Sequence, residues 1–310
     1  MYLYYNKYTR RINHKNRKKL GNMDFNELFN DSFEKTVIDR QKVNVKVNEY
    51  RNLITDKFGD IKFLEEGHKY FIGEDEYLPV SSVIKIYEPS VDWDKKAEDY
   101  ARKYGKNKEE VQKSWKLNNL KSTISGTRTH EFGESYTNLL CGHPELICEQ
   151  NKNQYVKEFN CLIPTYPKED AIKKFFDELP DYLYPIGAEF KMSTKYIKDA
   201  LPVCGTCDLL FYNSKDDGIE IFDWKTNKSL INEYSRKFGT MMYGPLCMFI
   251  DEPLSHYTVQ FNCYQRMLES IDLKIIGRTL VWLKDDGDYE TIPIEKINDS
   301  IMHIVMNCGK

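Results

Sequence analysis

The segment Gly205–Lys228 reads GTCDLLFYNSKDDGIEIFDWKTNK, and it places charged residues inside two apolar runs. Residues 204–213 and 219–226 are β-rich, and a turn-prone Asp-Asp-Gly segment separates them, so we expect two paired strands. Side chains alternate along a strand, so Asp223 and Lys225 must share one face. A buried strand face has no structural need of a carboxylate and an ammonium, which makes the pair a candidate functional site.

A second carboxylate, Asp208, opens the apolar run of the first strand. The turn at 213–218 can bring Asp208 close to Asp223, and two buried carboxylates side by side repel one another. A divalent cation with a preference for hard oxygen ligands relieves this repulsion, which points to Mg²⁺ or Mn²⁺. Lys225 could then orient a water molecule or neutralise charge on a phosphate. An Asp-x-Lys pattern alone is more often a salt bridge at a strand end.

The order of these residues resembles a known nuclease superfamily. An acidic residue followed fifteen positions later by hydrophobic-Asp-x-Lys is similar to the PD-(D/E)XK nucleases, with GTCD as the first acidic motif and IFDWKT as the second. The DWKT form looks like the branch of RecB-like, CRISPR-associated and mitochondrial genome maintenance exonucleases. The resemblance implies a restriction-endonuclease-like core in which Asp208 and Asp223 hold metal and Lys225 positions the attacking water.

A third motif lies upstream, where GTRTHE (126–131) is followed by Glu134. It looks like the GTxxHE segment of that branch, and His130 and Glu134 stand one helical turn apart on one face. The resemblance implies that His130 reaches the metal or the scissile phosphate. Taken alone, a helical histidine is more often a surface residue or a satisfied core residue.

Two further marks of the branch complete the pattern. Glu189 in GAEFK shares a strand face with Lys191, and the resemblance makes Glu189 an extra metal ligand; a plain exposed glutamate is the alternative. Gln260 and Tyr264 form Q-x-x-x-Y, which the resemblance assigns to support of the site and contact with DNA. Any amphipathic helix can carry such a pair.

The resemblance covers roughly residues 126–264, and GHKY (67–70) with PVSSV (79–83) also looks like the front hairpin of phage-type relatives. No key position is replaced, so we expect a competent enzyme that uses Mg²⁺ or Mn²⁺. We expect no iron–sulfur cluster, because only Cys308 lies beyond the Q-x-x-x-Y helix, where cluster-bearing relatives have three cysteines. The CxxC at 204–207 has no second ligand pair, and we interpret both cysteines as small core residues.

Composition constrains the remaining possibilities. The chain has 310 residues, of which 41% are hydrophobic, enough for one large domain or two modest ones. Residues 1–23 carry seven basic residues and no acidic one, so the net charge of −3 leaves −10 for the remainder. We expect a disordered tail at 1–23; the alternatives are a phosphate-binding arm, a targeting segment, or sequence upstream of an internal start at Met23.

The cellular setting is also an expectation from composition. Eight scattered cysteines indicate reduced thiols, and no apolar run is long enough to cross a bilayer. A polar, basic start argues against a secretory signal. We therefore expect an intracellular, cytoplasmic protein without a membrane partner, or one in a host cytoplasm if the Lys-, Asn-, Ile- and Tyr-rich composition reflects a viral genome.

Strands between helices predict an α/β fold with a central mixed sheet flanked by helices. We expect a helical N-terminal extension over 24–60, in which the alternating valines of 43–47 leave a short strand open, and a nuclease domain over 61–310. The first strands form a hairpin around Gly73, followed by a helix that Ser81 or Ser82 caps. The other expected helices span 93–120 with a break near Gly105, 126–140, 170–179, 233–250 and 257–271; the other strands span 186–194, 204–213, 219–226 and 275–286.

Together these features predict a DNA exonuclease that acts on single strands or free ends, in DNA processing, repair, recombination or viral DNA metabolism. Bases near the motifs would line a channel for phosphates: Arg128, Lys191, Lys195 and Lys228. The alternatives are a structure-specific or restriction-like endonuclease and a catalytically silent DNA-binding subunit. DNA is the expected partner, and a helicase or recombination protein is a candidate partner in trans.

Overall fold

The computed structural model describes residues 25–307 of the chain, with side chains from residue 40 onward. Segment 1–23 and Cys308 lie outside the described residues, so the expected basic tail stays a prediction. The strands are β1 (Ile61–Leu64), β2 (Lys69–Ile72), β3 (Asp75–Pro79), β4 (Tyr155–Val156), β5 (Cys161–Leu162), β6 (Leu183–Ser193), β7 (Val203–Asn213), β8 (Gly218–Lys225), β9 (Ile275–Leu283) and β10 (Tyr289–Pro293). The α-helices are α2 (Phe25–Phe58), α3 (Val80–Lys85), α4 (Trp93–Tyr104), α5 (Lys108–Leu140), α6 (Pro167–Glu178), α7 (Glu233–Phe238), α8 (Pro253–Glu269) and α9 (Asp299–Met306).

A mixed sheet forms the centre of the molecule. Its strand order is β1-β2-β3-β7-β8-β9-β10, with β6 paired to the other edge of β7. The β3–β7 and β8–β9 pairs run parallel, and the other pairs in this sheet run antiparallel. The predicted α/β fold with a central mixed sheet is therefore confirmed, and β7 is the strand on which three others converge.

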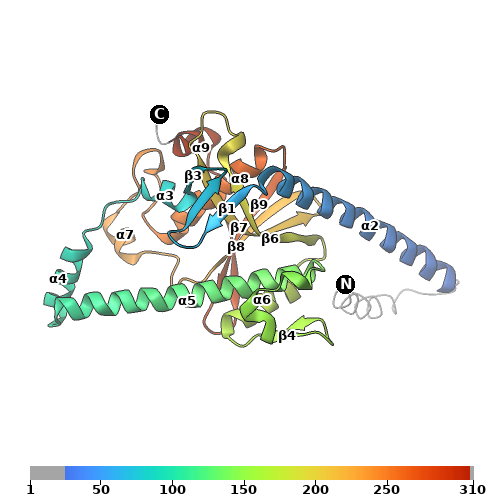
Figure 1. Cartoon of the computed structure of the whole chain (residues 1–310), viewed down its shortest axis with the longest axis horizontal. Helices are drawn as coiled ribbons and strands as arrows, with labels where there is room; N and C mark the ends of the chain where they lie inside the picture. Colours follow the sequence, from blue (N-terminus) through green and yellow to red (C-terminus); the bar gives the residue numbers. More distant parts are fainter. Residues whose placement is uncertain (1–24, 308–310) are drawn as a thin grey trace.

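Helices cover both faces of the sheet, which makes the molecule three layers thick (Figure 1). On one face α2, α3, α8 and α9 bury a core that includes Ile219 and Ile221 of β8. On the opposite face α5 and α6 pack against Phe222 and Trp224 of the same strand. Because both faces are covered, β7 is buried along almost its whole length. The predicted alternation along β8 is confirmed.

Turn chemistry joins β7 to β8 as predicted. The side chain of Asn213 accepts hydrogen bonds from the backbone N–H groups of Lys215 and Asp216, at 2.9 and 3.0 Å. Asp217 adopts a left-handed backbone conformation with φ of 46°, which aspartate tolerates better than most residues. The resulting turn fixes the register in which Asn213 pairs with Gly218.

The first half of the chain departs from expectation at two places. Residues 43–47 belong to the continuous helix α2, so the alternative strand is wrong there. Helix α3 begins at Val80 directly after Pro79, so Ser81 and Ser82 lie inside the helix and neither caps it. Proline fixes the extended entry to that helix without a side-chain cap.

Helix α5 is a single helix of 33 residues, where two separate segments were expected on either side of residues 121–125. The predicted break at Gly105 is confirmed, because this glycine ends α4 with φ of 61°. Within α5, residues 116–125 are exposed on every side. No proline interrupts the sequence there, and the C-terminal turns from Thr129 to Leu139 pack against the sheet, which holds the helix in one piece (Figure 1).

The second half contains a shorter helix than predicted. Helix α7 ends at Phe238, where Gly239 adopts φ of 62° and caps it, so the predicted helix over 233–250 is wrong beyond that point. The sequence also did not predict β10 or α9 as separate elements. Their residues are few, and tertiary contacts decide their conformation more than local propensity does.

Two absences apply to the described part of the chain only. No helix in residues 25–307 is long and apolar enough to cross a membrane. All seven cysteines of this range are free thiols, and both members of the CxxC at 204–207 are buried in the core, as interpreted from the sequence.

Gly205 offers a test of how tightly β7 packs. A Cβ atom at this position would lie 2.6 Å from Tyr264 Cε1 and 3.0 Å from Val80 Cγ2. Gly205→Ala is therefore expected to lower the free energy of unfolding by about 1–3 kcal/mol, measured by urea denaturation. Gly126→Ala is the matched control, because its nearest neighbour lies at 3.6 Å and alanine favours a helix by up to about 1 kcal/mol. Equal stability of the Gly205 variant and the wild type would contradict this packing.

Candidate functional site

The candidate site lies where β7 and β8 separate. Their ladder ends at the pair Leu209–Phe222, and Asp208 and Asp223 are the next residues on each strand. Nearer its start, at Val203 and Cys204, the same edge of β7 pairs with β3. A gap therefore opens between β3 and β8. The backbone N–H of Trp224 donates to Asp208 Oδ2 at 2.7 Å. A carboxylate thus replaces a backbone carbonyl as the acceptor at this strand fork, the point where β7 and β8 separate.

Glu189 approaches this gap from the other edge of β7. Its neighbours pair as Ala188–Leu209 and Phe190–Cys207, which places Glu189 opposite Asp208. Glu189 has φ of 52°, a left-handed conformation that costs a non-glycine residue about 1–3 kcal/mol and is concentrated at functional sites. The strand therefore distorts at the residue that delivers this carboxylate.

His130 reaches the gap from helix α5. Its Nδ1 atom lies 3.2 Å from Asp208 Oδ2, and the imidazole is half-buried. The approach depends on Gly133, since a Cβ atom there would lie 2.6 Å from Trp224 Nε1. A glycine one turn beyond the histidine therefore allows the helix to lie directly on the indole ring.

Three potential ligand atoms converge at this point. One atom each from His130, Glu189 and Asp208 lies within 4.8 Å of the others. Around an octahedral ion with bonds of about 2.1 Å, ligand atoms stand about 3.0 to 4.2 Å apart, so the three side chains would have to move closer together to bind one ion. Carboxylates suit Mg²⁺ or Mn²⁺, and an imidazole suits transition-metal ions, so this donor set fits a divalent cation.

Asp223 and Lys225 form a buried ion pair beside this group. Lys225 Nζ lies 2.5 Å from Asp223 Oδ1, and only 2% of the Asp223 side chain is exposed. The ammonium also stands 4.4 Å from the ring centroid of Tyr257, whose hydroxyl donates to Asn227. Asp223 is thus adjacent to the three converging ligands while it holds Lys225 in place.

The electrostatics of the site reflect crowded carboxylates. Burial, and next the Asp208 charge, raise the pKa of Asp223 to about 8 and the pKa of Glu189 well above its usual range. Burial opposes the ionised form of Asp208, but the neighbouring imidazolium outweighs it and holds the Asp208 pKa below its usual range. Burial likewise disfavours the charged His130, yet Asp208 raises its pKa to about 9. For Lys225, burial is outweighed by Asp223 and Asp208, and the pKa rises.

Helix α8 carries the Q-x-x-x-Y pair and packs against β7 beside the site. Gln260 Nε2 donates to the Tyr264 hydroxyl at 2.7 Å, and the buried tyrosine ring packs against Gly205. Burial, and next the charge of Asp223, raise the pKa of Tyr264 well above its usual range. Tyr264 thus lies against β7 close to Asp223, and the predicted roles of the pair in supporting the site and contacting DNA stay predictions.

The basic residues that were predicted to line a phosphate channel fall into two groups. Arg128 donates to the buried Glu169 at 3.0 Å and covers the ring of Tyr166, and Lys195 pairs with Asp60 at 2.6 Å, so both serve to join elements. Lys191 and Lys228 form no ion pair with any residue that the structure describes, and Lys228 is exposed. Glu134 is half-buried and accepts a hydrogen bond from Cys148.

Three contributors to the site were not predicted. They are the backbone N–H of Trp224, the Cα of Gly133, which bears no side chain, and the ring of Tyr257. No motif assigned a role to any of these three groups. Gly133 had one usable signal, because a glycine inside a helix commonly marks a close approach. Tyr257 lies on α8, and its place over Lys225 depends on the path of residues 226–252, which local sequence does not define.

No family model matches the chain, and no curated protein matches it. Among solved structures, one similar chain is a protein from Eubacterium rectale described as a "Putative exonuclease". It shares 12% sequence identity at a TM-score of 0.33, and the match covers 57% of this chain and 62% of that chain. The chain thus matches less than two thirds of that protein's length, and the likeness carries no argument about the site.

Cation binding to this site is expected to displace protons. Asp223, Glu189 and His130 all have raised pKa values, so the stability that they contribute to the metal-free protein is present at low pH and is lost as the pH rises through about 8 to 9. A cation needs the ionised carboxylates and the neutral imidazole, so Mn²⁺ affinity should rise between about pH 6 and 9 with release of about one proton or more per ion.

Isothermal titration in buffers of different ionisation enthalpy measures this proton release. Thermal unfolding in EDTA measures the stability of the metal-free protein, which should fall over the same pH range. Asp272→Asn, on an exposed turn where φ is 63°, is the control that leaves both trends unchanged. A Mn²⁺ affinity that falls as the pH rises would contradict the assignment.

The close approach of α5 gives a second prediction. Gly133→Ala is expected to push the helix away from Trp224 and to lengthen the His130–Asp208 contact. Overpacking of this kind costs about 1–3 kcal/mol of stability, and it should also lower the pKa of His130 toward its ordinary value, as measured by NMR titration of the imidazole. An unchanged titration in a correctly folded variant would show that the glycine does not position the histidine.

Proposed function

We propose that the chain is a divalent-metal-dependent deoxyribonuclease that hydrolyses phosphodiester bonds by an exonucleolytic mode on single strands or free DNA ends. One observation carries this proposal: three ligand atoms of His130, Glu189 and Asp208 converge within 4.8 Å at a strand fork, beside the lysine of an Asp-x-Lys pair. The sequence resemblance to PD-(D/E)XK nucleases supports the same assignment.

The chain's own residues divide the work. Asp208, Glu189 and His130 would hold the cation, with Asp223 adjacent to share its charge. When bound, the cation supplies Lewis-acid activation of the phosphate and of the attacking water. Lys225 is held in place by Asp223 and by the ring of Tyr257. Its ammonium can therefore donate to that water or to a phosphate oxygen without a rearrangement of the side chain.

Removal of one ligand tests the proposal. Asp208→Asn keeps an acceptor for the Trp224 N–H, so the fold should persist while the release of nucleotides from end-labelled DNA with Mg²⁺ falls by about 10²–10³-fold. Lys225→Met should show a similar loss, and EDTA should abolish wild-type activity. Asp272→Asn is the control with an exposed carboxylate. Activity of Asp208→Asn equal to that of the wild type would falsify the proposal.

Covalently closed single-stranded circles test the mode of cleavage. An exonuclease leaves the circles intact and degrades the same sequence once it is linear. Cleavage of circles would instead identify an endonuclease at this site. Tight DNA binding in EDTA with no turnover under any divalent cation would identify a silent DNA-binding subunit.

A further inference from the structure

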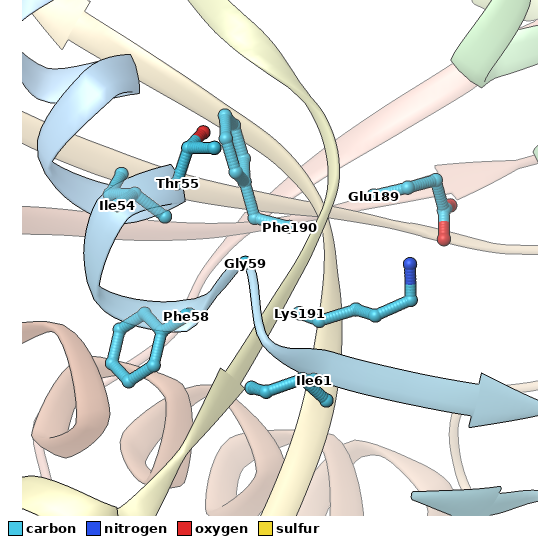
Figure 2. Close-up of a pocket in the computed structure, with 8 residues that line it drawn as sticks. All are labelled: Ile54, Thr55, Phe58, Gly59, Ile61, Glu189, Phe190 and Lys191. Carbon is cyan, nitrogen blue, oxygen red and sulfur yellow. The ribbon is translucent and has the colours of Figure 1, made fainter. Parts of the chain in front are cut away.

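A pocket of about 140 Å³ lies beside the candidate metal ligands. It is formed where the end of α2 and the start of β1 pack against β6 (Figure 2). The residues that line it are Ile54, Thr55, Phe58, Gly59, Ile61, Glu189, Phe190 and Lys191. It is smaller than the roughly 300–1,000 Å³ of pockets for drug-sized ligands, so it suits a single ring system.

The pocket has an apolar side and a charged side. Ile54, Phe58 and Ile61 form the apolar wall, and the ring of Phe190 lies beside Thr55 of α2 (Figure 2). On the charged side, the side chains of Lys191 and Glu189 point toward one another (Figure 2). Glu189 also belongs to the converging ligand group, so the pocket opens directly next to the proposed reaction centre.

Lys191 differs from other lysines in this region. Lys195 pairs with Asp60 at 2.6 Å, and Lys225 pairs with Asp223. Among the residues that the structure describes, the side chain of the half-buried Lys191 forms no hydrogen bond or ion pair. An ammonium at the mouth of an apolar pocket, without such a partner, complements an anion that carries an apolar ring.

We infer that this pocket receives the terminal nucleotide of a DNA strand, with the base on the apolar wall and a phosphate oxygen on Lys191. This inference rests on the proposed function, and it adds the feature that makes the enzyme end-dependent. Helix α2 and Gly59 form the wall of the pocket that faces away from Glu189, so a strand seated in it has one nucleotide beyond the reaction centre. The N-terminal helix is then part of substrate recognition.

Two variants of the full chain test the pocket from its two sides. Lys191→Gln removes the cation, and Thr55→Trp places a ring in the pocket from an exposed position on α2. Each should weaken the binding of thymidine monophosphate by about tenfold or more, measured by titration in EDTA. Lys191→Gln loses a charge-assisted hydrogen bond to the phosphate, and Thr55→Trp blocks the contact with the base. Each should also raise KM for linear DNA by about tenfold. Lys198→Gln, on an exposed loop, is the charge-matched control.

The outcomes separate the two proposals. Wild-type nucleotide affinity and KM in both pocket variants would overturn the inference, as would inorganic phosphate that binds as tightly as the nucleotide, since the pocket would then be an anion site only. If the wild type hydrolyses no DNA but its nucleotide binding is lost in both variants, the pocket assignment stands and the nuclease assignment fails.

Discussion

The hydrogen bond from the Trp224 backbone N–H to Asp208 is the contact on which the site depends. It joins β7 to β8 at the point where their ladder ends, so the strands separate without leaving a buried N–H group unsatisfied. The same carboxylate faces His130 and lies opposite Glu189. One side chain therefore closes the fork and gathers the remaining ligands around it.

Burial opposes the charged form of each ionisable group in this arrangement. Three carboxylates and a lysine are removed from water within a small region, and burial is the largest opposing factor for each ionised group among them. Natural proteins retain such clusters when the charges serve a ligand. The strained conformation of Glu189 fits the same view, because an ordinary strand residue there would pack without strain.

Much of the site was predictable because its residues lie on regular elements. Strand alternation placed Asp223 and Lys225 together, and the hairpin placed Asp208 beside them. The spacing did not show that Asp223 would hold Lys225 while His130, Glu189 and Asp208 form the closest ligand group. The continuity of α5 and the early end of α7 also escaped prediction, because packing of Thr129–Leu139 and a left-handed Gly239 decided them.

Helix α5 has one more consequence for the molecule. Its exposed section, residues 116–125, reads KLNNLKSTIS and contains several residues with poor helix propensity. Because every residue of this section is exposed, its helical state depends mainly on the two ends of α5, which pack against the rest of the described structure. The free energy of local opening is therefore smallest in the middle of the helix and rises toward His130. The end of the helix that carries His130 is stable, whereas the centre of the same helix is its most easily unwound part.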